Sequence, residues 1–321
     1  AVLLSPPLAL GRALGSCRSM VEPRAEPRPL AGALWMLAAG LCFVAVTALV
    51  KYLGDRVPAP QSAFLRYLLG LVFLLPALRP LLRARPTRRQ HLLFGARGLF
   101  HAMGVMLWFY AMTRIPLAEV TAMNYLSPVY VTVGAALFLG ERLALRRIGA
   151  VAVALAGAMV ILRPGFRELD PGHLAMLGTA AIFGASYLLG KVVSDETDPA
   201  LVVAMLSVWV TVGLVPFAAA VWIAPTLPEL GVLFAVAFFA TGGHYAMSLA
   251  FRAAPVTVTQ PVTFLQLVWA VILGAAVFGE AIDPFVVTGG LIIIGAVSFI
   301  TWREAVLKRR AITPAGPETK G

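Results

Sequence analysis

The stretch that decides the fold is GALWMLAAGLCFVAVTALVKYL at residues 32–53, because it recurs as GHLAMLGTAAIFGASYLLGKVV at residues 172–193. The shift between the two stretches is 140 positions. The positions of the first stretch that keep their residue in the second include Gly32, Met36, Leu37, Phe43, Ala45 and Lys51. Self-similarity of this kind indicates that one structural unit occurs twice in the chain.

A second match, near the end of each copy, supports the same repeat. FLGERLALRRIGAVAVALAGAMVIL aligns with VFGEAIDPFVVTGGLIIIGAVSFI at a shift of 139. This shift pairs Glu141 with Glu280 and Pro116 with Pro255. Because the two shifts differ by only one residue at opposite ends of the unit, chance similarity is a poor explanation.

The composition is that of a membrane protein. Of the 321 residues, 60% are hydrophobic and 13% are charged, whereas a soluble domain has about 25% charged residues. Apolar segments of the length that crosses a ~30 Å hydrocarbon core follow one another along the chain. The sequence therefore predicts an all-α membrane protein with ten transmembrane helices, at residues 30–51, 61–82, 92–112, 117–139, 147–163, 172–192, 200–223, 229–251, 256–278 and 283–302.

Five of these segments fall in each copy, which predicts two inverted-topology five-helix repeats. Because five is odd, the second copy must enter the membrane from the opposite side. Such repeats are typical of alternating-access carriers, whose substrate site lies near the bilayer midplane between the repeats. The expected regions are a disordered tail at 1–29, repeats at 30–165 and 170–302, and a basic cytoplasmic tail at 303–321.

The placement of Lys and Arg predicts the orientation. With the N-terminus in the cytoplasm, 19 of the 26 Lys and Arg residues lie in cytoplasmic segments, 5 lie in outer loops, and Arg66 and Arg97 lie within spans. Positive residues concentrate on the cytoplasmic side, so both termini are expected there, in a bacterial inner membrane. The net charge of +11 comes from these helix-end clusters, and nucleic acid is not expected as a partner.

Neither a metal nor a cofactor is expected. Cys17 and Cys42 are far apart and outside any metal-ligand spacing, so no zinc site or disulfide framework follows. The sequence contains no HExxH motif and no phosphate-binding loop, so ATP is not implied.

Three other functions are less well supported by the sequence. Ser186 and His244 resemble the serine–histidine dyad of rhomboid proteases, as nucleophile and base, but rhomboids lack two inverted five-helix copies. A channel would require a filter loop or a charged ring, and the outer loops are short. A non-transporting membrane scaffold is the third alternative. We expect a carrier and not an enzyme.

Several short stretches are similar to those of one known group of proteins. They are KYLG at 51–54, FLRY at 64–67, ARGLF at 96–100, RIPLAEVTAMNYLSPVY at 114–130, and the paired FLGE and VFGE. Together they resemble the drug/metabolite transporter superfamily, and within it the EamA-type carriers. The resemblance implies a ten-helix secondary carrier of a small organic metabolite, with a central cavity between the repeats.

The resemblance leaves the substrate open. AEVTAMNYLSP looks most like aromatic amino-acid exporters, whereas KYLG, FLRY and RGLF look more like S-adenosylmethionine carriers. Riboflavin importers carry similar stretches. The implied cargo is therefore an amino acid, S-adenosylmethionine or a riboflavin-like molecule.

The segment from Pro116 carries the first candidate site. Glu119 lies in the first helical turn, where the helix dipole favours a carboxylate. It is either an interfacial helix-end group or a proton- or substrate-binding carboxylate at the outer mouth. On a helical wheel Thr121, Asn124, Tyr125 and Pro128 share another face. The hydrocarbon core of a bilayer does not satisfy the hydrogen bonds of an amide such as that of Asn124. This face is therefore expected to contact protein or a water-filled cavity.

The second repeat mirrors this face. At a shift of 139, Thr121, Asn124 and Tyr125 correspond to Gln260, Thr263 and Phe264. Because the copies are inverted, the two polar faces are expected at similar depth. They line a substrate cavity or form interhelical hydrogen bonds.

Other candidates for the substrate cavity are polar or aromatic residues within apolar spans. Arg66 has no acidic residue in its own segment, so it is expected to face a cavity, a carbonyl cluster or an anionic substrate group. His101 and His244 are packing histidines or cavity groups. Trp108 and Tyr187 stack a planar substrate or anchor the membrane interface.

Two further features have structural interpretations. Glu141 and Glu280 each follow a Gly at a helix end and are expected to be structural. Ala150, Ala154 and Ala158 form a small-residue stripe, which packs within the protomer or contacts a second copy. The protein is expected to be a monomer or a homodimer.

Overall fold

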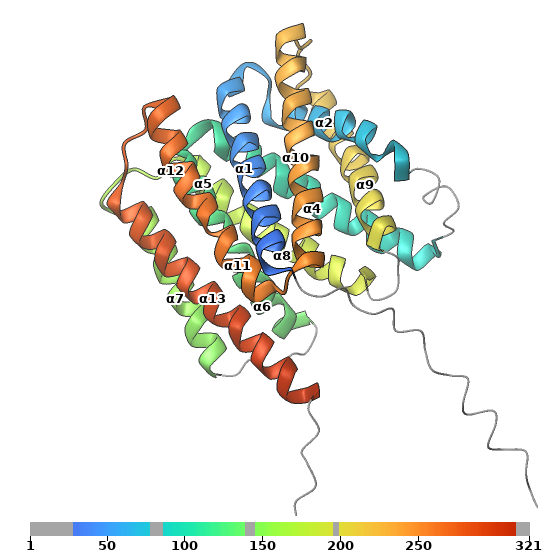
Figure 1. Ribbon diagram of the computed structural model, residues 1–321. Helices are drawn as coiled ribbons and strands as arrows, with labels where there is room; N and C mark the ends of the chain where they lie inside the picture. The colour runs from blue at the N-terminus through green and yellow to red at the C-terminus, as the bar shows by residue number, and fades with distance from the viewer. Residues whose placement is uncertain (1–27, 78–85, 139–144, 195–198, 313–321) are drawn as a thin grey trace, which may run out of the picture.

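In the computed structural model, which describes residues 28–77, 86–138, 145–194 and 199–312, the chain is a bundle of α-helices (Figure 1). The first repeat contains α1 (Pro29–Leu53), η1 (Gly54–Arg56), α2 (Ala59–Gly70), η2 (Leu71–Ala77), α4 (Arg88–Arg114), α5 (Leu117–Asn124), α6 (Ser127–Phe138) and α7 (Leu145–Leu162). The second contains α8 (Pro171–Ser194), α9 (Pro199–Ala220), α10 (Leu227–Ala253), α11 (Val256–Thr263), α12 (Leu265–Phe278) and α13 (Pro284–Ile312). Residues 1–27 of the expected N-terminal tail, residues 313–321 of the expected C-terminal tail, and Glu141 lie outside the described residues.

The helices bear out the membrane architecture but not the number of spans. Among the described residues, eight helices are long and apolar enough to cross a membrane, and Ala59–Leu75 is a shorter apolar helix. The remaining expected segment, at 117–139, is divided between α5 and α6. The elements of the described part of the chain are all helices, joined by turns and loops, and none of them is a strand. By length and composition alone, ten spans therefore remain a prediction.

Both repeats break one helix at the same place. α5 and α11 are eight residues long, and they end at Asn124 and Thr263, which are equivalent at the shift of 139. After α5 the cause is Pro128, whose ring would clash with the carbonyl of Asn124 in a continuous helix. In the second repeat, Pro261 lies inside α11, shortly before its end.

The break corrects the expectation of one continuous polar face over 117–139. Thr121 and Tyr125 are buried, at 4% and 8% exposure, whereas Pro128 is exposed. A helical wheel assumes an unbroken helix, so it cannot relate residues on the two sides of the break.

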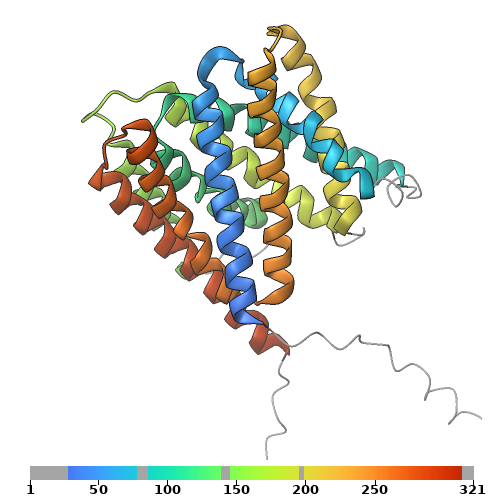
Figure 2. The ribbon, with the colours of Figure 1, turned by 45° about the horizontal axis from the view of Figure 1, so that its top comes forward.

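The helices of one repeat interleave with those of the other. α1 packs along α10, as Figures 1 and 2 show, and α8 packs along α4. Each of these pairs becomes the other when the repeats are exchanged. α7 pairs with α13, and α2 with α9, so these pairs map onto themselves. The contacts therefore follow a twofold relation between the repeats.

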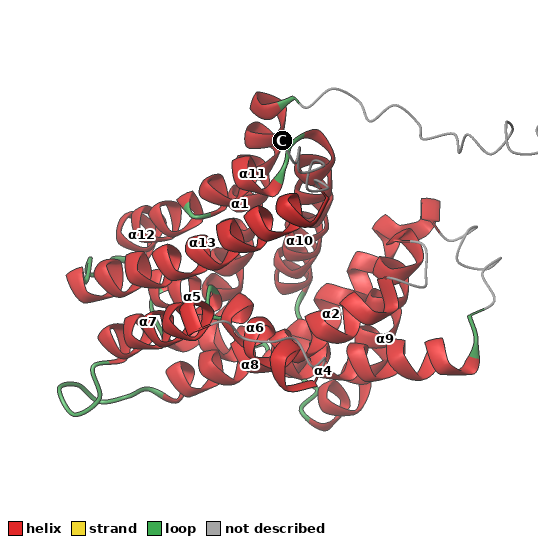
Figure 3. Ribbon diagram, turned by 90° about the horizontal axis from the view of Figure 1, so that it is seen from below, coloured by secondary structure: helices red, strands yellow, loops and turns green. Residues whose placement is uncertain are grey.

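Equivalent helices also run in opposite directions. Near the end of α1, Lys51 Nζ donates a hydrogen bond to the carbonyl of Ile115 at 2.9 Å. At the start of α8, a Cβ added to Gly172 would lie 2.9 Å from Cγ2 of the same Ile115. We call this end of the bundle the Lys51 end. α1 begins and α13 ends at the opposite end, from which Figure 3 views the molecule.

Small residues allow the closest helix contacts. A Cβ added to Gly98 of α4 would lie 2.4 Å from Cβ of Trp209 in α9. Between α7 and α13, a Cβ added to Gly157 would lie 2.8 Å from the carbonyl oxygen of Gly289. The small-residue stripe of α7 is buried within the chain, which fits packing inside the protomer: Ala150, Ala154 and Ala158 are 7%, 0% and 3% exposed.

Candidate functional site

A cluster of aromatic and basic side chains surrounds His101 in the interior of the bundle. The His101 ring stacks on Phe183 of α8, with centroids 4.8 Å apart and an interplanar angle of 29°. Tyr67 of α2 and Tyr187 of α8 meet the His101 ring edge to face, with centroids 6.3 Å and 6.4 Å away. Tyr67 is buried, whereas Tyr187 is 45% exposed. We call these rings, with Arg66 and Arg97, the interior cluster.

The cluster lies halfway along the helices. His101 is thirteen residues from each end of α4, or about 20 Å at 1.5 Å per residue. Arg97 precedes it by one helical turn and so shares its face. Arg66 lies seven residues after Ala59, the first residue of α2. Side chains at this depth are far from the polar headgroups of a bilayer.

Four residues that the sequence singles out as cavity candidates meet in or beside this cluster. Arg66 has its Cζ 3.9 Å from the centroid of the Tyr67 ring. Trp108 contacts Phe183 edge to face at 6.3 Å, and its buried Nε1 has no hydrogen-bond partner among the described residues. His101 and Tyr187 belong to the cluster itself. Their role in substrate binding stays a prediction.

His244 of α10 contacts α1. Its ring lies 5.0 Å from that of Phe43 in an edge-to-face contact. Ser186 pairs instead with His101, with Oγ 3.3 Å from Nδ1. A Ser186–His244 dyad is therefore not the pairing found here.

The two polar faces around the helix breaks meet directly. Tyr125 donates a hydrogen bond from its hydroxyl to the carbonyl of Thr263 at 3.2 Å. Its ring meets that of Phe264, its repeat equivalent, at 5.4 Å. This pairing fits the alternative of interhelical hydrogen bonding. Asn124 keeps a buried Oδ1 without a hydrogen-bond partner among the described residues, and Gln260 is half-buried.

Glu119 is held in a polar network at the Lys51 end. It is 2% exposed, and its two oxygens accept hydrogen bonds from Arg167 at 2.9 Å each. His173 Nε2 of α8 lies 2.5 Å from the same carboxylate. The hydrogen bonds with Glu119 raise the pKa of the Arg167 guanidinium above its ordinary value. The carboxylate thus links three segments: α5, the loop that follows α7, and α8. It does more than end a helix.

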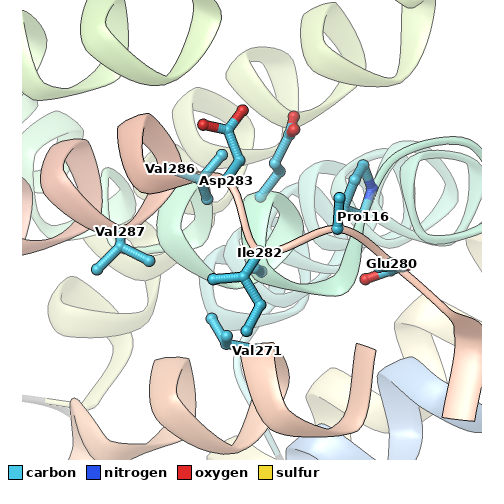
Figure 4. Close-up of a pocket in the computed structure, with 10 residues that line it drawn as sticks. Pro116, Val271, Glu280, Ile282, Asp283, Val286 and Val287 are labelled. Atoms are coloured by element: carbon cyan, nitrogen blue, oxygen red, sulfur yellow. The ribbon is translucent and has the colours of Figure 1, made fainter. Parts of the chain in front are cut away.

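Glu280 completes the closure of this end. Its carboxylate accepts a hydrogen bond from the backbone N–H of Leu117 at 2.9 Å and lies 2.7 Å from Lys51 Nζ. Nearby, Arg163 pairs with Asp283. Figure 4 shows the small pocket beside these groups. It is lined by Pro116, Ala118, Glu119, Val271, Glu280, Ala281, Ile282, Asp283, Val286 and Val287.

Sequence reasoning missed part of both sites. Arg97 carried a usable signal, because an arginine within an apolar segment marks a functional candidate. Phe183 also carried a signal, since it is the repeat equivalent of Phe43 and both copies keep a phenylalanine there. Arg167 and His173 gave none, because polar residues in loops and at helix starts are common. In the described part of the chain, no three His, Cys, Asp or Glu side chains are grouped to hold a metal.

Comparisons with known proteins agree with this architecture. The model of the EamA-like transporter family matches residues 30–163 and again 170–302. A riboflavin transporter of Rhizobium johnstonii is 31% identical over 300 residues, covering 90% of this chain and 96% of that protein. An S-adenosylmethionine uptake transporter of Rickettsia bellii is 27% identical over 275 residues, covering 84% and 93%.

The fold is similar to that of a solved structure. A crystal structure of a protein with 19% sequence identity covers 85% of this chain and 99% of its own, with a TM-score of 0.55. At this identity the likeness concerns the fold alone. The family resemblance inferred from the short stretches is confirmed, and the chain belongs to the EamA-like transporter family.

Proposed function

We propose that this protein is a secondary carrier that moves a planar, ring-containing metabolite across a bacterial inner membrane by alternating access. The observation that carries the proposal is the interior cluster, in which His101 lies at the middle of α4 among rings from α2 and α8. Flat rings bind well against aromatic faces. A midplane site between two repeats is accessible from each side in turn.

The described side chains favour a riboflavin-like cargo over S-adenosylmethionine. Arg66 and Arg97 are the charged groups beside the cluster's rings. S-adenosylmethionine carries a net charge of +1, because its sulfonium and ammonium groups outweigh its single carboxylate, so two arginines would on balance repel it, and more strongly in a medium of low dielectric. Riboflavin is uncharged and presents a flat three-ring system. The riboflavin transporter among the relatives supports this choice.

The proposed topology has ten spans in two inverted five-helix repeats, at 30–165 and 170–302, with both termini in the cytoplasm. Support comes from the opposite directions of α1 and α8, and from the excess of Lys and Arg on one side. The Lys51 end is then the outer end. Its carboxylate contacts hold that end closed in this structure, so transport requires them to open.

Rival functions have less support. The relatives are transporters, which favours a carrier over an enzyme, a channel or a scaffold. The energy would come from an ion gradient or from the gradient of the solute. The proposed partners are the cargo and the lipid bilayer, with no cofactor and no nucleic acid, and the protein is proposed to be a monomer or a homodimer.

Counterflow in proteoliposomes tests the proposal. Vesicles loaded with unlabelled riboflavin are expected to accumulate labelled riboflavin transiently and saturably, and vesicles loaded with S-adenosylmethionine are not. His101→Leu is expected to lower this uptake, whereas His91→Leu, at an exposed position of the same helix, serves as the matched control. Absence of flavin counterflow contradicts the cargo, and a non-saturable flux would indicate a channel.

A further inference from the structure

The two guanidinium groups of the interior cluster, those of Arg66 and Arg97, have no carboxylate partner among the described residues. Arg66 is 9% exposed, and its guanidinium lies over the ring of Tyr67. Arg97 donates from Nη1 to the carbonyl of Val202 at 3.5 Å, and its buried Nε has no hydrogen-bond partner in the part of the chain that the structure describes. The salt bridges of the described residues include neither arginine. An arginine at this depth is costly in a membrane protein unless something neutralises it.

The acidic side chains that the structure describes lie at helix ends and in loops, too far from Arg66 and Arg97 to pair with them. They lie after α1, at the starts of α5 and α10, between α7 and α8, and between α12 and α13, which places them at the Lys51 end. They are Asp55, Glu119, Glu168, Asp170, Glu229, Glu280 and Asp283. Several of them already pair with Lys51, Arg163 or Arg167. The middle of the bundle therefore holds positive charge without a described counter-charge.

Both arginines lie beside the rings around His101. Arg66 has its Cζ 3.9 Å from the centroid of the Tyr67 ring, which in turn meets His101 at 6.3 Å. Arg97 lies one helical turn before His101 on the same face of α4. Close packing fixes Arg97 in place, because a Cβ added to Gly190 of α8 would lie 2.9 Å from its Cζ. A flat molecule lying against His101 would thus have a guanidinium within reach of its edge.

We propose that the interior cluster is a binding site for a planar heteroaromatic molecule that carries an anionic oxygen group, either phosphate or carboxylate. The ring lies against His101 and Phe183, and Arg66 and Arg97 receive the anion. Guanidinium groups match such anions through paired, charge-assisted hydrogen bonds. This inference rests on the proposed function and narrows it, because riboflavin itself is neutral. The preferred form of a flavin cargo is then an acidic derivative.

Binding to the purified full-length protein in lipid nanodiscs tests this inference. The probes are riboflavin, riboflavin 5′-phosphate and a flavin with a carboxymethyl side chain, each followed by flavin fluorescence. We expect at least one acidic flavin to bind about ten- to hundredfold more tightly than riboflavin, the factor for one charge-assisted contact. The two acidic probes show whether phosphate or carboxylate is preferred.

Variants of the two arginines test whether they cause the preference for acidic flavins. Arg66→Gln and Arg97→Gln are each expected to reduce the ratio of acidic to neutral affinity severalfold, while Arg66→Lys keeps part of it. Arg252→Gln, at an exposed position near the end of α10, is the matched control and is expected to keep the full ratio. Size-exclusion profiles and riboflavin binding by Arg66→Lys show that the site remains folded.

Two outcomes would overturn the inference in distinguishable ways. If riboflavin binds and neither acidic flavin binds more tightly, or the preference persists in both Gln variants, the anion site is wrong and the carrier function stands. If no flavin binds at all, the proposed cargo fails, and this inference fails with it.

Discussion

Lys51 of the first repeat and Glu280 of the second form an ion pair, with Nζ 2.7 Å from Oε1. The same carboxylate accepts a hydrogen bond from the N–H of Leu117, and Lys51 donates to the carbonyl of Ile115. One carboxylate therefore ties α1 and the end of α12 to the turn between α4 and α5. Because Lys51 and Glu280 belong to different repeats, the pair must separate if the repeats move apart at this end.

Removing the charge of Glu280 is expected to open the Lys51 end more often. The reporter is a cysteine at Ala118, which lines the pocket beside Glu280, in a chain without Cys17 and Cys42. With Glu280→Gln, a membrane-impermeant thiol reagent added outside should label this cysteine severalfold faster. Glu168→Gln, at an exposed loop position, is the control. An unchanged labelling rate in both Glu280→Gln and Lys51→Gln would contradict the closure assigned to this pair.

Glu119 is expected to matter first for stability. Glu119→Gln removes the charge that Arg167 and His173 contact. The expected loss in the free energy of unfolding is about 2–3 kcal/mol, below that of a fully buried pair because Arg167 is partly exposed. The unfolding temperature in detergent measures it, with Glu168→Gln as control. If both variants unfold at the wild-type temperature, the network has no stabilising role.

The contact between α4 and α9 leaves no room for a side chain at Gly98. An added Cβ would lie 2.4 Å from Cβ and 2.9 Å from the carbonyl carbon of Trp209. Gly98→Ala is therefore expected to destabilise the fold by about 1–3 kcal/mol. Gly295→Ala, where an added Cβ meets nothing within 4 Å, should be neutral or slightly stabilising. Equal unfolding temperatures for the two variants would show that α4 and α9 yield easily.

Stacking in the interior cluster should be visible in substrate affinity. Phe183→Leu keeps an apolar side chain but removes the ring that stacks on His101. Loss of aromatic stacking worth about 0.5–1.5 kcal/mol predicts riboflavin binding weaker by about two- to tenfold. Flavin fluorescence titration measures it, with Phe166→Leu, a loop position that is 92% exposed, as the comparison. Wild-type affinity in Phe183→Leu would remove this ring from the site.

The signals within the chain were enough for the helical membrane protein and its repeat, and they drew attention to residues that the structure brings together. Repeated stretches and apolar segments are properties of local order, so they predict helices, repeats and a membrane protein without any contact being known. Arg66 and His101 stand out in the same way, since a polar side chain within an apolar segment needs a partner. The structure does bring these two residues together in one cluster.

By itself, the sequence determined the helical membrane protein, its repeat and its family, because these follow from residue patterns along one segment at a time. Only the tertiary structure decided the partners: Ser186 meets His101 and not His244, and Glu119 meets Arg167, 48 residues away. The physical reason is that such contacts depend on how helices from two repeats cross and rotate against one another. Breaks such as the one after Asn124 change that geometry, and a helical wheel does not contain it.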